Sequence, residues 1–138
     1  VHEICPLVHV GVRSLSAEEM VFIRDAGLPV HFWSPPPEDE HGLAEAVVAS
    51  LSSRVYVSVD LDVFDPSIMA AVGTPEPGGL SWASVTALLR AVGEQREIVG
   101  FDITELSPAE GPEASAFTAA KLVKKLIGYA TMREHKRA

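Results

Sequence analysis

The chain has 138 residues, a formal net charge of −8 and 47% apolar residues, which is enough apolar content for the core of one domain. An isoelectric point near 5.0 argues against a nucleic-acid or anionic-membrane partner, since both need a basic surface, and no apolar run approaches the roughly 20 residues that span a bilayer. The single cysteine, Cys5, excludes an internal disulfide and, without the pattern of a secretory signal, favours the reducing cytoplasm.

In chain order, the first half alternates short apolar runs with helical patterns. Ser16 and Glu19 match a capping box, which predicts that a helix begins after Ser16, and Gly27 suits a left-handed stop. The expected elements are, in order, a strand at residues 7–12, a helix between Ser16 and Gly27, a strand at residues 29–33 closed by the prolines at 35–37, and a helix from about residue 39 to residue 51.

The strand expected at residues 55–59 leads directly into Asp60-Leu61-Asp62. Successive side chains of a strand point to opposite faces, so Asp60 and Asp62 are expected to project in the same direction. Two neighbouring carboxylates repel each other and lose hydration, which a shared cation or proton compensates. The pair therefore makes a metal or phosphoryl-transfer site the first hypothesis.

The segment that follows is dense in glycine and proline. Residues 73–79, with the sequence GTPEPGG, predict a loop. The elements expected after it are a helix capped by Ser81 and ending at Gly93, a strand at residues 98–105 that again ends in an acid, and a helix at residues 113–129 with a basic tail.

A strand and a helix thus alternate four times, and the strands are apolar on both faces. This pattern predicts an α/β fold with about four strands, in which a doubly wound, mostly parallel sheet has helices on both faces. Ligands of such folds bind beyond the carboxyl ends of the strands. The polar side chains expected at those ends are Arg13, Asp60, Asp62, Asp65 and Glu105.

Three ordered motifs resemble a known family. They are SVDLDVFDP at residues 58–66, GTPEPGGL at residues 73–80 and GFDITELSP at residues 100–108. Together they closely resemble the C-terminal half of the ureohydrolases, the arginase and agmatinase family, and VGVRS at residues 10–14 resembles the strand end that precedes them in the agmatinase branch. Residues 1–138 are accordingly interpreted as the C-terminal portion of one arginase-like α/β domain.

The resemblance implies that a guanidino group is cleaved to urea and an amine at a pair of manganese ions. It implies that Asp60 bridges both metals, that Asp62 is a further ligand of one of them, and that Glu105 holds the guanidinium of a small substrate. Hard oxygen ligands suit Mn²⁺, and paired metals lower the pKa of water toward neutrality. An anionic Glu105 complements a planar cation. No catalytic residue is expected here beyond the metal site.

The chain also departs from the family pattern. The family's other metal ligands, a histidine and an Asp-Ala-His-x-Asp strand, and its proton-shuttling histidine have no counterpart in this sequence. A family strand that lies between the strands at residues 7–12 and 55–59 is missing as well. We therefore expect a partial site, empty or weakly loaded, that a preceding half of the protein completes. The residues before the loop are Ala70-Ala71-Val72, where the family often has Pro-Gly-Thr. Ser16 stands where arginases carry an aspartate for the substrate's α-amino group. The serine therefore favours agmatine or another decarboxylated guanidine over arginine.

Other polar and aromatic residues have ordinary interpretations. Asp65 precedes a proline and is expected to be a structural cap, and Asp102 is expected to be a buried acid that points away from Glu105. Trp33 and Trp82 are expected to be packing residues. The histidines show no mutual ligand spacing, and the one inside an apolar strand is expected to be a core histidine; they are His2, His9, His31, His41 and His135.

Two alternatives stay open. An apolar strand followed by Asp-x-Asp-x-Phe also partly fits the haloacid-dehalogenase phosphohydrolases, in which Asp60 would be a nucleophile and Asp62 an acid or base working with Mg²⁺. No downstream Asp-Asp pair for the magnesium follows, and the GTPEPGG loop has no role there. The chain is alternatively a non-catalytic fragment that acts by association, because exposed strand edges around a missing strand predict a homo-oligomer.

Overall fold

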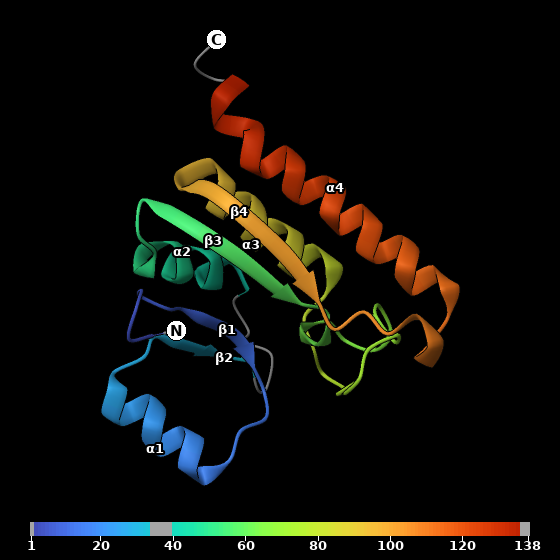
Figure 1. The fold of residues 1–138 in the computed structure, drawn as a ribbon, viewed down its shortest axis with the longest axis horizontal. Coiled ribbons are helices and arrows are strands. Elements are labelled where there is room, and N and C mark those ends of the chain that lie inside the picture. Colours follow the sequence, from blue (N-terminus) through green and yellow to red (C-terminus); the bar gives the residue numbers. More distant parts are fainter. Residues whose placement is uncertain (1, 34–39, 136–138) are drawn as a thin grey trace.

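The computed structural model describes residues 2–33 and 40–135 (Figure 1), so the predicted stop at the prolines 35–37 lies outside the described residues. Strands and helices alternate in the predicted order. They are β1 (His9–Val12), α1 (Ala17–Ala26), β2 (Val30–Phe32), α2 (Glu40–Ser50), β3 (Arg54–Asp60), α3 (Trp82–Gln95), β4 (Glu97–Thr104) and α4 (Glu113–His135). Two short 3-10 turns follow β3 and β4, η1 at Leu61–Val63 and η2 at Pro108–Glu110. Among the helices described, none is both long and apolar enough to cross a membrane.

The strands form two separate parallel pairs. β3 and β4 are paired from Arg54 with Glu97 to Asp60 with Thr104, whereas β1 and β2 are paired over only a few residues. Within the described part of the chain, no ladder joins the two pairs, and Figure 1 shows them as separate pairs with a gap between β1 and β3. The parallel α/β fold is confirmed, and its sheet is divided where the sequence led us to expect a missing strand.

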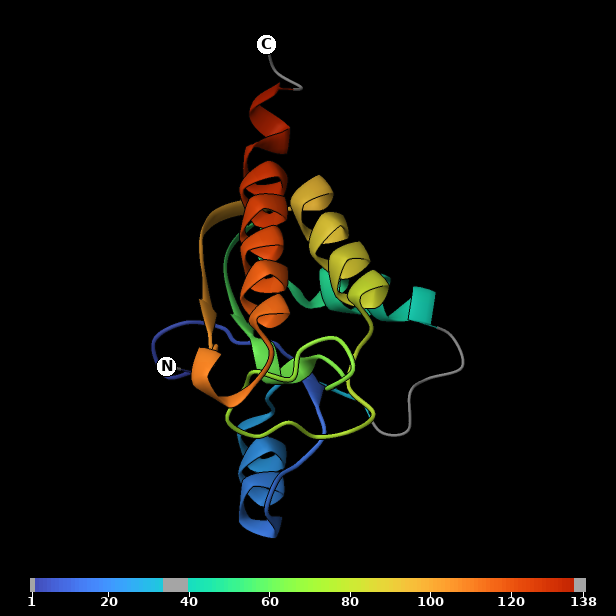
Figure 2. The same ribbon diagram turned by 90° about the vertical axis from the view of Figure 1, so that its right-hand side faces the viewer.

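The core lies on one face of the β3–β4 pair. Figure 2 shows α3 and α4 side by side on this face. The buried side chains between these layers include Val59, Leu61, Phe64, Leu89, Leu122 and Leu126. Each large aliphatic side chain buried in this way contributes about 1.5–3 kcal/mol to folding. Trp33 is 2% exposed, and Trp82 stacks on Phe64 with ring centroids 6.1 Å apart, so the packing roles predicted for both tryptophans are confirmed.

The two long helices extend beyond their predicted ends. Gly93 lies inside α3, which continues to Gln95. A Cβ at Gly93 would lie 2.8 Å from the carbonyl oxygen of Tyr129 in α4. The stop predicted at Gly93 is therefore wrong, because this glycine serves the close approach of two helices. α4 likewise runs past residue 129 to His135.

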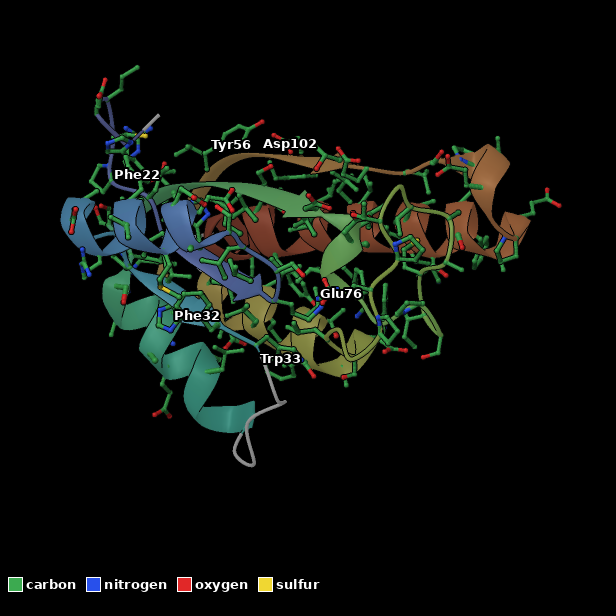
Figure 3. The ribbon with its side chains drawn as sticks, turned by 90° about the horizontal axis from the view of Figure 1, so that it is seen from below. Phe22, Phe32, Trp33, Tyr56, Glu76 and Asp102 are labelled. Atoms are coloured by element: carbon green, nitrogen blue, oxygen red, sulfur yellow. The ribbon has the colours of Figure 1, made fainter. Side chains whose placement is uncertain are left out.

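The other face of the β3–β4 pair carries no helix among the described residues. Tyr56, on that face, is 62% exposed, and its hydroxyl donates to Asp102 at 2.8 Å while the Ser58 hydroxyl donates to the same carboxylate at 2.7 Å. Donation from Ser58 and then Tyr56 lowers the pKa of Asp102, and bonding to Asp102 raises the pKa of Tyr56. Figure 3 shows Tyr56 and Asp102 together at this face. The prediction of a buried Asp102 is wrong, because nothing in the described chain covers this side of the sheet.

The β1–β2 pair and α1 are loosely packed by comparison. The capping box of α1 is confirmed, with Ser16 Oγ accepting from the Glu19 N–H at 3.1 Å, and Gly27 ends the helix at a φ of 61°. Yet α1 has no buried residue. His9 is exposed, so the prediction of a core histidine is wrong: β1 begins at His9 itself, and its first residue lies at an open end of the strand.

Candidate metal and substrate site

The carboxyl end of β3 places the first two acids. The strand stops at Asp60, and η1 begins at the next residue, anchored by the fully buried Leu61. Asp60 Oδ1 accepts a hydrogen bond from the backbone N–H of Asp62 at 2.9 Å. The expectation that strand alternation aligns the two acids is therefore wrong. A tight turn, in which Asp60 is the cap, brings the two residues together instead.

Asp62 has one satisfied oxygen and one without a partner. Its Oδ2 accepts from the hydroxyl of Thr74. Its Oδ1 is buried and has no hydrogen-bond partner among the described residues. An unpaired buried carboxylate oxygen costs several kcal/mol unless a donor or cation satisfies it. The orphaned oxygen therefore fits a bound cation.

The segment between residues 65 and 80 is a closed loop whose ends are hydrogen-bonded to each other. Leu80 N–H donates to Val63 O at 2.8 Å, and Asp65 N–H donates to Leu80 O at 3.0 Å. The Asp65 carboxylate accepts from Ser67 and from the Gly78 N–H at 2.8 Å. These bonds, led by that of the Ser67 hydroxyl, lower the pKa of Asp65 to about 2. The predicted structural role of Asp65 is confirmed.

The first residues of the predicted GTPEPGG loop run across three strand ends. A Cβ at Gly73 would lie 3.7 Å from Glu105 Oε2, beyond β4. Thr74 bonds Asp62, beyond β3. Glu76 accepts from the Ser14 hydroxyl at 2.7 Å, beyond β1. Figure 3 shows Glu76 near the ends of β1 and β3. The loop thus lies against residues that follow three separate strands.

Glu105 has a strained backbone. Its φ of 67° makes it the non-glycine residue with a left-handed conformation in the described chain, an arrangement that costs about 1 kcal/mol or more for a residue with a Cβ. Such strain persists where surrounding structure enforces it, and it clusters at functional sites. The conformation turns Glu105 out of β4 toward the Gly73 end of the loop.

Arg13, at the end of β1, bonds three backbone carbonyl oxygens. Its Nη1 donates to Val63 O at 3.0 Å, and its Nη2 donates to Asp62 O at 2.8 Å and to Glu76 O at 3.3 Å. The sequence placed Arg13 at this edge without a role. It gave no role to Ser14, Thr74 or Glu76 either, because glycine and proline content predicts a loop but not which side chains of the loop turn inward.

The site carries unbalanced negative charge. The ion pairs seen among the described residues join Arg24 with Asp25, Arg54 with Glu97 and Arg90 with Glu94, all away from these strand ends. Asp60, Asp62 and Glu105 therefore have no cationic side chain paired with them in the described chain. Carboxylate oxygens are ligands of hard divalent cations such as Mn²⁺.

The donors are too few for a complete metal centre. Among the described residues, no group of three or more His, Cys, Asp or Glu side chains is placed to hold an ion. Asp60 and Asp62 stay the two carboxylates of this edge that are predicted as metal ligands.

Comparison with known proteins agrees with the three motifs. Residues 3–128 match the Arginase family, so the match spans every element that borders the site and gives no support to the phosphohydrolase alternative. The chain is 42% identical over 126 residues to an N(1)-aminopropylagmatine ureohydrolase of Thermus thermophilus, covering 89% of this chain and 41% of that protein. It is 37% identical over 125 residues to the enzyme of the same name from Synechocystis sp., covering 90% of this chain and 40% of that protein.

Solved structures give the same result. The agmatine ureohydrolase of Thermoplasma volcanium superimposes with a TM-score of 0.77 at 34% identity, covering 94% of this chain and 44% of that one. The chain thus spans about two fifths of the length of the curated relatives that it matches. From its motifs, its fold and these matches, the chain belongs to the arginase family.

Proposed function

We propose that this chain forms part of a binuclear-manganese ureohydrolase that cleaves the guanidino group of agmatine or a similar amine. The observation that carries the proposal is the buried Oδ1 of Asp62 beside Asp60, which has no partner among the described residues, at a strand edge whose carboxylates pair with no cationic side chain in that part of the chain. The names of the relatives, ureohydrolases of agmatine and of N(1)-aminopropylagmatine, support the reaction class.

Asp60 and Asp62 are the residues of this chain that would hold the metal. Bound manganese would supply Lewis-acid chemistry and make water nucleophilic near neutral pH. The chain itself prepares the ligands: η1 fixes Asp62 relative to Asp60, and Thr74 orients the Asp62 carboxylate by bonding one of its oxygens. An outer hydrogen bond of this kind fixes a ligand's orientation and leaves its second oxygen for the ion.

Glu105 is the residue that would receive the substrate. A carboxylate binds a planar guanidinium through two parallel N–H···O bonds, and the left-handed backbone of Glu105 turns it toward the loop that also holds Asp62. In the reaction, water would add to the guanidinium carbon, the bond from that carbon to the alkylated nitrogen would break, and the departing nitrogen would take up both protons of the water. One guanidinium and one water give one urea and one alkylammonium ion, so atoms and charge balance.

The substrate we propose is an amine rather than an amino acid. The Ser16 hydroxyl accepts from the Glu19 N–H as the cap of α1, and no carboxylate stands at its position to bind an α-amino group. The acidic surroundings favour substrates with a cationic tail, because net charge −8 attracts polyamines.

The test is manganese-dependent release of urea by the whole polypeptide encoded by the gene. We expect urea from agmatine and from N(1)-aminopropylagmatine, much less from arginine, and loss of turnover on chelation. Asp62→Asn should lower turnover about a hundredfold or more. Asp25→Asn is the matched control, because Asp25 lies on α1, where it pairs with its neighbour Arg24 away from these strand ends, and it should change turnover little. Absence of urea from all three substrates with manganese present would refute the proposal.

Residues 1–138 alone test the partial-site idea. We expect this polypeptide to bind manganese weakly, to release no urea, and to associate through the inner edges of β1 and β3. Light scattering measures the association. A monomer with full activity would contradict the view that further ligands complete the site.

A further inference from the structure

One side chain connects the two halves of the site. Arg13 lies just beyond β1, and the carbonyl groups that it bonds belong to Asp62, Val63 and Glu76, which are 49, 50 and 63 residues away in the chain. The same Nη2 atom bonds the carbonyls of Asp62 and Glu76. This shared donor fixes the middle of the loop, at Glu76, against the turn that carries a proposed metal ligand.

The choice of acceptors is informative. An arginine beside an acidic cluster ordinarily pairs with a carboxylate, because bidentate pairing is the stronger interaction. Here the guanidinium bonds only carbonyl oxygens among the described residues. In the Asp62 carboxylate, one oxygen accepts from Thr74 and the other has no partner in the described chain. Arg13 thus organises the backbone around Asp62 without neutralising the ligand.

The approach of β1 to this turn is close. Gly11 has a φ of 83°, and a Cβ there would lie 2.5 Å from Cγ2 of Val63. No strand ladder joins β1 with β3 in the described chain. The hydrogen bonds of Arg13 and the bond from Ser14 to Glu76 therefore supply the polar link between the two strand pairs at this end.

We propose that Arg13 is a positioning residue of the metal site, which holds the backbone of Asp62–Val63 and the loop at Glu76 so that Asp62 keeps the orientation needed to bind the ion. The metal part of this inference rests on the proposed function. Lysine cannot replace arginine here, because its single ammonium is a point donor and cannot span three separated carbonyls as a planar fork does.

The chain offers a matched control in Arg96. In the described chain its guanidinium also bonds only carbonyl oxygens, with Nη2 donating to Val48 O at 2.6 Å and Nε donating to Leu51 O at 3.2 Å. Arg96 precedes β4, at the end of the sheet opposite to the site. Arg96→Lys therefore removes the same kind of bonds without touching the acids.

The experiment compares Arg13→Lys with Arg96→Lys in the whole polypeptide. Manganese affinity is measured from the electron paramagnetic resonance signal of free Mn²⁺, and amide hydrogen exchange is measured over residues 74–80 and 97–104. We expect Arg13→Lys to weaken manganese binding by about 10–100-fold, as changes behind a ligand do, and to speed exchange at residues 74–80. We expect Arg96→Lys to change manganese affinity less than about twofold while affecting exchange at residues 97–104.

The two readouts separate failure of this inference from failure of the proposed function. Unchanged exchange at residues 74–80 in Arg13→Lys overturns the positioning role. Faster exchange with unchanged manganese affinity overturns its connection with the metal. If the unaltered protein binds no manganese, the proposed function fails, while faster exchange in Arg13→Lys still supports the positioning of the loop by Arg13.

Discussion

The β3–β4 pair and the β1–β2 pair have the same topology but are stabilised differently. β3 and β4 are paired along all seven residues of β3, with α3 and α4 packed on one face and an apolar core between them. β1 and β2 are four and three residues long, and the helix beside them has no buried residue. One pair has its own core, whereas the other depends on contacts at its ends.

The difference explains where the candidate site lies. The acids sit at the end of the well-packed pair, in turns fixed by buried neighbours such as Leu61 and Leu80. The less packed pair reaches them through Arg13 and Ser14. A rigid support on one side and a polar link on the other suit a site that must bind an ion in a fixed geometry.

Leu122→Ala against Phe22→Ala is the strongest test of this comparison. Leu122, in α4, is 0% exposed, so truncation should cost about 2–5 kcal/mol of unfolding free energy through lost burial and a cavity. Phe22, in α1, is 50% exposed, and its truncation should cost about 1 kcal/mol at most. Urea unfolding followed by circular dichroism measures both. Equal losses would contradict the claim that the core belongs to the β3–β4 half.

Gly11→Ala against Gly27→Ala tests the joint between the halves. Both glycines have positive φ, at 83° and 61°, so an alanine at either costs about 1–2 kcal/mol in backbone strain. Only at Gly11 does a new Cβ meet a neighbour, at 2.5 Å from Val63 Cγ2. Relief of that overlap must displace β1 or the turn after β3, which adds about 1–3 kcal/mol. Urea unfolding gives the two losses, and a Gly11→Ala loss no larger than that of Gly27→Ala would show that β1 does not press on the turn.

The order of elements was predictable from the sequence because each has a local signal. Examples are the capping box at Ser16, the left-handed glycine at residue 27 and the proline-rich loop at residues 73–79. The errors came from tertiary contacts. Gly93 resembles a helix stop in sequence, but its small size is used against Tyr129. Asp102 lies in an apolar strand and is therefore expected to be buried, but no described element covers the face of the sheet that carries it.

The sequence was sufficient to predict the acidic residues of the site, but not the hydrogen bonds that connect them to other segments. The motifs pointed to Asp60, Asp62 and Glu105, whose metal and substrate roles stay predictions. The bonds made by Arg13, Ser14 and Thr74 span 12 to 63 residues of sequence. Local patterns carry no signal for such pairs, because they depend on how a long loop folds across separate strands.

Asp65→Asn is expected to give the smallest effect, and one that depends on pH. The pKa of Asp65 is lowered from 3.8 to about 2 by its bonds to Ser67 and Gly78. A carboxylate with a lowered folded-state pKa stabilises the protein above its unfolded pKa and loses that contribution as pH falls through its folded pKa. In urea unfolding at pH 6, the midpoint concentration should therefore be higher for the unaltered protein than for Asp65→Asn. The two midpoints should converge as the pH falls from about 4 to about 2.

Ser67→Ala supplies the matched control, because the Ser67 hydroxyl makes the largest contribution to the lowered pKa of Asp65. Without that donor, the folded-state pKa of Asp65 should move back toward its ordinary value. The difference in stability between Ser67→Ala and the double variant Ser67→Ala with Asp65→Asn should then disappear at a higher pH than it does with Ser67 present. A difference that stays constant from pH 6 to pH 2 would mean that the charge of Asp65 does not hold the loop. The ends of the loop would then be held chiefly by the backbone bonds between Val63, Asp65 and Leu80. The bond from Arg13 to Glu76 would restrain the part of the loop near Asp62 more than the Asp65 carboxylate does.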